Sequence, residues 1–247
     1  MGESIIQSSI NFLTRQEKSF NVNMIRRSIE NFANALSQQY QSIYIIALGA
    51  DSAQVGLINS LANIGVTIAA LPTGWALDRY GLKKAFIFAT IFMSLGALMF
   101  GLSPNWIYTI PALFIFSLAA SVARTSCPVV CGSALVNQDR AVGMQLCDSL
   151  AAISGIIAPI VGAWIIASSG GMTADGIRPI FFAQFGVLII MFLLIITKFT
   201  NPSKRAEPRK GLSIMEGIKE VQRRGVAVKR YLLYSSIERI PFYLNTI

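Results

Sequence analysis

The stretch Gly74-Trp75-Ala76-Leu77-Asp78-Arg79-Tyr80-Gly81-Leu82-Lys83-Lys84 separates two apolar segments that are each long enough to cross a bilayer. It contains one acidic residue, three basic residues and two glycines. Because the connection is so short, the two flanking segments must form an antiparallel hairpin. Its excess of positive charge is typical of the cytoplasmic side of a membrane, so the stretch predicts the orientation of every other helix.

The composition is that of a membrane protein. Hydrophobic residues make up 53% of the 247 residues and charged residues 13%, whereas a soluble domain has roughly 25% charged residues. The net charge of +9 does not indicate a nucleic-acid partner, because the basic residues are confined largely to alternate loops. The chain has no histidine, and its three cysteines have no metal-binding spacing, so we expect no metal and no cofactor.

The basic residues define the two sides of the membrane. Eighteen Lys and Arg residues fall in the N-terminal segment and in the loops on the same side as the opening stretch, and one, Arg178, falls in the opposite loops. This bias places the N-terminus in the cytoplasm, in a multi-pass protein of the cell membrane.

We therefore expect an all-α membrane protein with a bundle of six transmembrane helices, at about residues 28–48, 52–76, 85–102, 106–128, 141–167 and 179–197. The predicted domains are a cytoplasmic tail (1–25), the bundle (26–198), a basic cytoplasmic linker (199–230) and the start of a seventh helix (231–247). That last segment has 17 residues, fewer than the roughly 20 that a span requires, so we expect the chain to be a fragment. It carries Glu238 and Arg239, which form a weak candidate for a coupling pair.

Two of the predicted spans carry polar stripes, which predict a cavity. The first span has amides at steps of three and four, which places Asn31, Asn34, Gln38 and Gln41 on one face. The fourth span has Ser117, Ser121 and Arg124 on one face. Because polar side chains facing lipid are costly, these faces should line a water-filled cavity or contact other helices. Helix-to-helix hydrogen bonding is the alternative interpretation.

Arg124 and Asp148 are predicted to form an ion pair within the membrane. Each lies twelve residues from Val136, the midpoint of the hairpin between the fourth and fifth spans, so at about 1.5 Å per residue they reach a similar depth. An unpaired arginine at the bilayer centre costs roughly 2.5–3.5 kcal/mol, which favours a partner. Structural pairing and a role in substrate or proton coupling are both open.

The six spans repeat in character after three helices. The first and fourth are striped with polar residues, the second and fifth are rich in small residues and proline, and the third and sixth are almost uniformly apolar, with Gln184 the main exception in the sixth. Repeats offset by three helices have opposite orientation, as in secondary transporters. In the fifth span, Ser154, Ala158, Pro159 and Gly162 predict close helix packing.

The pattern Gly74-x-x-x-Asp78-Arg79-x-Gly81-x-Lys83-Lys84 resembles the signature turn between helices 2 and 3 of the major facilitator superfamily. The resemblance implies the N-terminal half of a secondary transporter that works by alternating access, with two inverted three-helix repeats. It also implies that Gly74, Asp78, Arg79, Gly81, Lys83 and Lys84 belong to a latch that contacts a missing C-terminal half.

The sequence departs from the family pattern at three places. Leu82 stands where a basic residue is usual, Arg124 lies late in its helix, and the fifth span keeps only a softened glycine and proline motif. Proton coupling and export therefore stay open, and the expected partners are the bilayer and a small-molecule substrate of unknown identity. A six-helix channel or a dimerising half-transporter is the alternative function. An intramembrane enzyme is disfavoured, because no nucleophile lies beside a base.

Overall fold

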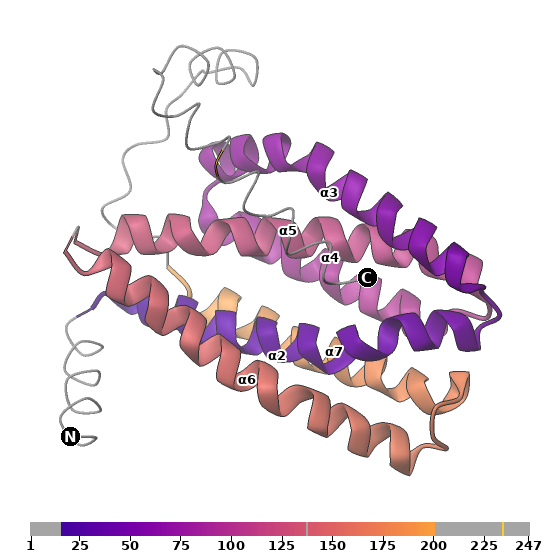
Figure 1. Ribbon diagram of the computed structural model, residues 1–247. Helices are drawn as coiled ribbons and strands as arrows, with labels where there is room; N and C mark the ends of the chain where they lie inside the picture. The colour runs from indigo at the N-terminus through magenta and orange to yellow at the C-terminus, as the bar shows by residue number, and fades with distance from the viewer. Residues whose placement is uncertain (1–15, 137, 201–233, 235–247) are drawn as a thin grey trace. The chain divides into compact units, whose positions relative to one another are not determined.

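The computed structural model describes residues 16–136, 138–200 and 234, apart from the side chains of residues 69–72, 74–76, 78, 124, 126 and 127 (Figure 1). The helices are α2 (Lys18–Ala47), α3 (Ser52–Tyr80), α4 (Leu82–Leu102), the short 3-10 helix η1 (Trp106–Tyr108), α5 (Thr109–Ala134), α6 (Arg140–Ser168) and α7 (Ala174–Lys198). No strand occurs in this described part of the chain, and the predicted all-α class is confirmed. The predicted linker and seventh helix lie outside the described residues, except for residues 199, 200 and 234.

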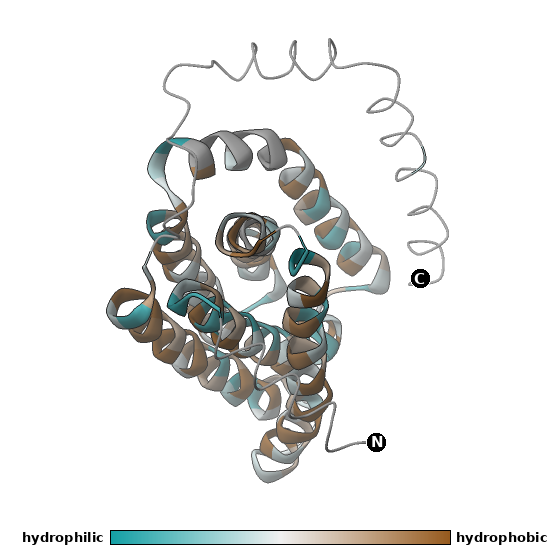
Figure 2. Ribbon diagram, turned by 90° about the vertical axis from the view of Figure 1, so that its left-hand side faces the viewer, coloured by the Kyte–Doolittle hydropathy of each residue, from teal (hydrophilic) through white to brown (hydrophobic). Residues whose placement is uncertain are grey.

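Within the described residues, four helical segments are long and apolar enough to cross a membrane: Leu82–Leu102, Trp106–Ala134, Arg140–Ser168 and Ala174–Lys198. Figure 2 shows hydrophobic residues along the described helices, interrupted by shorter hydrophilic stretches. Many large apolar side chains point outward, and Ile156 and Trp164 are 70% and 72% exposed. Outward apolar surface of this extent suits a lipid environment. The crossings by α2 and α3 stay predictions.

The turn between α3 and α4 consists of a single residue. α3 ends at Tyr80 and α4 begins at Leu82, and Gly81 between them has a φ of 85°. Only glycine adopts this left-handed conformation without a steric penalty. The predicted stretch is therefore mostly helical, with Arg79 in the last turn of α3 and Lys83 in the first turn of α4.

α2 begins at Lys18, within the segment that we predicted to be a tail. Its first turns are buried rather than free: Phe20 and Met24 pack in a hydrophobic cluster with Cys131 and Leu135 of the α5 end. The apolar residues of this segment are too widely spaced to suggest a span. They are sufficient for a helix that has a neighbouring helix to pack against.

The packing of the helices repeats after three. α2 packs extensively on α6 and α7, α5 packs extensively on α3 and α4, and α4 packs on α7. If α2, α3 and α4 are exchanged with α5, α6 and α7, the contacts of α2 become those of α5, and those of α5 become those of α2. The contact between α4 and α7 stays the same. The contacts thus agree with the two three-helix repeats predicted from the sequence.

Three hydrogen bonds from side chains to backbone carbonyls join α2 to α6. They are Asn31 Nδ2 to Ala151 O (2.6 Å), Ser154 Oγ to Ser28 O (2.9 Å) and Tyr40 OH to Pro159 O (3.0 Å). Two of them involve residues of the predicted packing motif in the fifth span. Hydrogen bonds of this kind stabilise helix pairs where water is excluded.

Gly162 brings the backbones of α2 and α6 close together. A Cβ atom at this position would lie 2.9 Å from the Leu36 carbonyl oxygen and 2.9 Å from Tyr40 Cε2. Ala158, one turn away, is fully buried. Small residues at such a contact let two helices approach more closely than larger side chains allow.

α4 and α7 are joined at both ends by reciprocal contacts. Lys83, in the first turn of α4, donates to the carbonyl of Ile196 near the end of α7 (2.9 Å). Arg178, in the second turn of α7, donates to the carbonyl of Ser103 at the end of α4 (3.0 Å). Carbonyls at helix C-termini lack intrahelical partners and carry partial negative charge, so each cation stabilises the end of the other helix.

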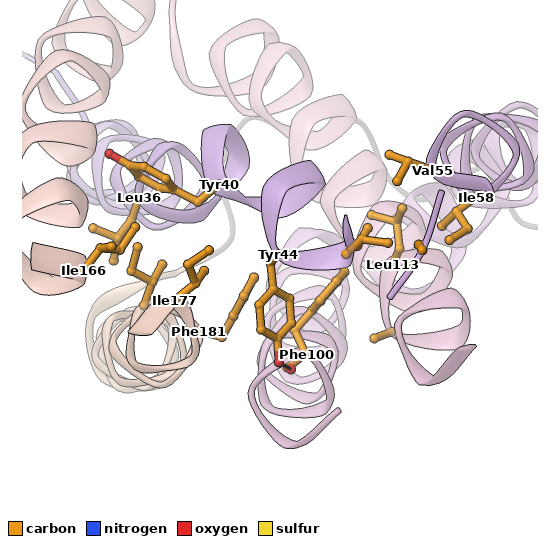
Figure 3. Close-up of a cluster of buried hydrophobic side chains, with 14 of the residues drawn as sticks. Leu36, Tyr40, Tyr44, Val55, Ile58, Phe100, Leu113, Ile166, Ile177 and Phe181 are labelled. Carbon is orange, nitrogen blue, oxygen red and sulfur yellow. Dashed lines mark hydrogen bonds between the residues drawn. The ribbon is translucent and has the colours of Figure 1, made fainter. Parts of the chain in front are cut away.

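An aromatic cluster joins α2, α4 and α7 (Figure 3). The Phe100 and Phe181 rings stack with centroids 5.0 Å apart, and the Tyr44 ring lies 4.8 Å from that of Phe181. The buried Tyr44 hydroxyl donates to the Phe100 carbonyl (2.9 Å) and accepts from Arg178 (3.4 Å). This cluster forms one wall of the candidate site.

Candidate functional site

A cavity of about 140 Å³ lies between α2, α4, α5 and α7. Its lining is Asn34, Ser37, Gln38 and Gln41 from α2, Phe100 from α4, Leu113, Phe116, Ser117 and Ala120 from α5, and Phe181 and Gln184 from α7. More than half of these side chains are neutral and polar, and none of the described lining residues is charged. The site therefore suits a polar molecule without a net charge.

Two buried amide atoms of the cavity lining lack a hydrogen-bond partner within the described part of the chain. They are Oδ1 of Asn34, an acceptor, and Nε2 of Gln184, a donor. Leaving a buried polar atom unpaired costs roughly 1–3 kcal/mol. A ligand hydroxyl can both donate and accept, so a hydroxyl-bearing ligand could satisfy both atoms.

Aromatic side chains supply the apolar part of the lining. Phe100 and Phe181 come from the stacked pair described above, and Phe116 comes from α5. Ligand sites commonly combine apolar walls with a few polar groups that fix orientation. The amide side chains of the cavity can thus hydrogen-bond the hydroxyl groups of a ligand, and its aromatic rings can pack against the ligand's C–H groups.

Four of the cavity residues predicted from the sequence line this space: Asn34, Gln38, Gln41 and Ser117. Ser121, one turn further along α5, is not among the lining residues, and its carbonyl accepts a hydrogen bond from Thr125 (2.9 Å). Sequence reasoning did not select Ser37 or Gln184 for the site. The signal for Gln184 was its position as a lone amide in an otherwise apolar helix.

Asp148 lies on the exposed side of α6, away from the cavity lining. Its side chain is 62% exposed, and its Oδ1 atom lies 3.8 Å from Nη2 of Arg27. Exposed pairs at this separation contribute little to stability. The side chain of Arg124 lies outside the described residues, so the pairing of Arg124 with Asp148 stays a prediction.

A buried ion pair lies on α2, one helical turn before Asn34. Nη1 of Arg26 is 2.5 Å from Oε2 of Glu30, and both side chains are almost completely shielded. The Arg26 guanidinium also lies over the Phe86 ring of α4, 4.0 Å from its centroid. Oε1 of Glu30 has no hydrogen-bond partner among the described residues, and Nη1 of Arg27 is 3.9 Å from it.

Sequence reasoning missed this pair because it placed Arg26 at the helix start and did not consider Glu30. The available signal was an arginine and a glutamate four residues apart, which share a helix face. A charge inside a predicted span is by default a candidate functional residue.

The predicted latch residues have separate surroundings. Arg79 is exposed, with its guanidinium 6.0 Å from the centroid of the Tyr80 ring, and Lys83 binds the end of α7. Lys84 lines a second, apolar groove. The side chain of Asp78 lies outside the described part, so the latch stays a prediction.

Comparison with known proteins gives one family and one fold. The family model of the Major Facilitator Superfamily matches residues 23–243, whereas a search of curated proteins finds no match. The structure is similar to that of the E. coli fucose:proton symporter, with a TM-score of 0.67 and 18% identity over 84% of this chain and 57% of that one. It is also similar to a D-xylose-proton symporter, with a TM-score of 0.60 and 14% identity over 83% and 52%. The chain thus spans little more than half the length of these structures.

Proposed function

Because the chain belongs to the Major Facilitator Superfamily, a family of secondary transporters, we propose that it forms the N-terminal half of a transporter for an uncharged, hydroxyl-bearing solute. The neutral polar cavity supports this proposal, above all the unpaired Asn34 and Gln184 amides. Monosaccharides fit this chemistry, and the two similar structures are symporters of fucose and xylose. The solute would bind between this half and a second half that alternately opens the cavity to either side. We also propose that the residues of the predicted latch contact the second half, and that the N-terminus lies in the cytoplasm.

Uptake of radiolabelled monosaccharides by membrane vesicles containing the protein tests this function. We expect saturable uptake of at least one neutral sugar. Asn34→Leu and Gln184→Leu should each reduce uptake about tenfold, because each removes a hydrogen bond in a buried site. Asn63→Leu is the matched control, since Asn63 is an exposed residue of α3 that is absent from the cavity lining.

Equal uptake by the two cavity variants and the control would contradict the site. If the 247-residue chain alone does not transport, sugar binding is measured by the shift of its thermal unfolding. We then expect a smaller sugar-induced shift for Asn34→Leu and Gln184→Leu than for Asn63→Leu and the unchanged protein. Preference for charged solutes over sugars would contradict the proposed substrate class, and transport by a dimer of the chain would favour the half-transporter alternative.

We further propose that transport is coupled to protons through Glu30. Its carboxylate is buried one turn from the cavity, and the charged groups around it are Arg26 and Arg27 of α2, with Asp148 of α6 beyond Arg27. Protonation of Glu30 would neutralise the partner of Arg26. The carboxylate would thereby link proton binding to the packing of Arg26 on α4.

Glu30→Gln is expected to abolish uptake driven by a pH gradient while leaving exchange of solute across equilibrated vesicles. The amide imitates the protonated carboxyl and cannot release a proton. Asp175→Asn is the control, because this carboxylate is exposed in the first turn of α7, pairs with Arg178 and does not line the cavity, and it should retain gradient-driven uptake. Gradient-driven accumulation by Glu30→Gln at the level of the unchanged protein would exclude the coupling role.

A further inference from the structure

A groove much larger than the candidate cavity lies between α3, α4 and α5. Its volume is about 1140 Å³, and nearly all of its lining is apolar, the polar groups being the hydroxyls of Thr73 and Tyr80 and the ammonium of Lys84. Its residues differ entirely from those of the polar cavity. A neutral, hydroxyl-bearing solute would find few hydrogen-bonding partners along these walls.

The groove is open along its length to the surroundings of the protein. Among its lining residues, Ile64 and Ile68 of α3 are 55% and 71% exposed, and Phe88 of α4 is 61% exposed. Along α3 the lining extends from Ile58 to Tyr80, which at about 1.5 Å per residue is roughly 33 Å. This length is comparable with the roughly 30 Å hydrocarbon thickness of a bilayer. The groove therefore offers acyl chains a path along the protein.

The charge of the groove is confined to one end. Lys84 lies in the first turn of α4, next to Tyr80 at the end of α3. Its ammonium group makes no hydrogen bond or ion pair with the described residues, in contrast to the neighbouring Lys83, which binds the Ile196 carbonyl. At one end the groove thus has a cation with no partner among the described residues, and the rest of its walls are apolar.

We propose that this groove binds an anionic phospholipid from the leaflet on the side of the α3–α4 turn. The phosphate would contact Lys84, and an acyl chain would lie against Ile68 and Phe88. Charge complementarity selects an anionic headgroup, and the open apolar walls select a lipid rather than a water-soluble anion. The site shares Lys84 with the proposed latch, and lipid binding is measured below without any transport.

Native mass spectrometry of the full chain, released from vesicles of equal phosphatidylglycerol and phosphatidylcholine, tests the proposal. We expect preferential retention of one phosphatidylglycerol. Lys84→Gln should weaken that retention about fivefold, the effect expected for one lysine near an anionic lipid surface. Lys198→Gln is the matched control, because Lys198 ends α7 and does not line the groove.

A second pair of variants tests the apolar walls. Leu61 and Leu57 are both exposed on α3, and only Leu61 lines the groove. Leu61→Trp should displace the lipid, and Leu57→Trp should not. Equal retention of both phospholipids, retention insensitive to Lys84→Gln, or absence of bound lipid because another part of the protein fills the groove would each overturn the proposal. Binding of free inorganic phosphate with the same affinity would also overturn it.

Discussion

Replacing Arg26 by Leu is expected to destabilise the protein by about 3–5 kcal/mol, the usual cost of removing one partner of a buried ion pair. Glu30 would then hold a shielded carboxylate without its 2.5 Å contact. The Phe86 ring would lose the guanidinium that covers it, and with it a link between α2 and α4. Reversible unfolding in mixed micelles with increasing SDS, followed by circular dichroism, measures the change.

The double variant Arg26→Met with Glu30→Leu is the informative control. Replacing both charges by apolar side chains removes the uncompensated carboxylate, so most of the lost stability should return. Arg27→Leu should cost far less, because this side chain is partly exposed and lies 3.9 Å from Glu30. A double variant as unstable as Arg26→Leu would show that the interaction of Arg26 with Phe86, rather than the ion pair, is the stabilising contact.

Gly162→Val is expected to destabilise the protein by about 3 kcal/mol, at the upper end of the usual cost of overpacking. The new Cβ would lie 2.9 Å from the Leu36 carbonyl oxygen, a backbone atom that cannot rotate away. α2 and α6 would have to separate, which would lengthen the Tyr40 to Pro159 hydrogen bond. The same SDS unfolding experiment measures the loss.

Gly186→Val is the matched control, since Gly186 is also a helical glycine and a Cβ there meets no atom within 4 Å. It should be nearly neutral. Similar destabilisation by both substitutions would mean that helix propensity, and not the contact between α2 and α6, decides the effect. A Gly162→Ala variant should fall between the unchanged protein and Gly162→Val, because the alanine carries only the first of the clashing atoms.

Sequence patterns predicted the parts of the fold and site that depend on helix periodicity. Asn34, Gln38 and Gln41 share a face by spacing alone, and the structure places them in one cavity lining. The hairpin at Gly81 followed from the shortness of its connection. The limits of the helices were less predictable, because α3 and α4 continue to within one residue of each other.

The remaining features depend on contacts between distant segments. The burial of Arg26 depends on α4, which brings Phe86 against its guanidinium, and the early start of α2 depends on the end of α5. Gln184 is a single residue and forms no periodic pattern, so its place in the site appears only once α7 packs against α2. The apolar groove depends on the separation of three helices, which hydropathy does not encode.

The reciprocal contacts between α4 and α7 bear on the order in which the protein is made. Lys83 and Ser103 lie at the two ends of α4, and each has its partner on α7. That partner is synthesised 113 residues after Lys83 and 75 residues after Ser103. Until then both ends of α4 lack those partners, so the first three-helix repeat would insert before it is fully stabilised. Synthesis of α7 supplies first Arg178 and then the Ile196 carbonyl, so we expect α4 to reach its final packing only after α7 is complete.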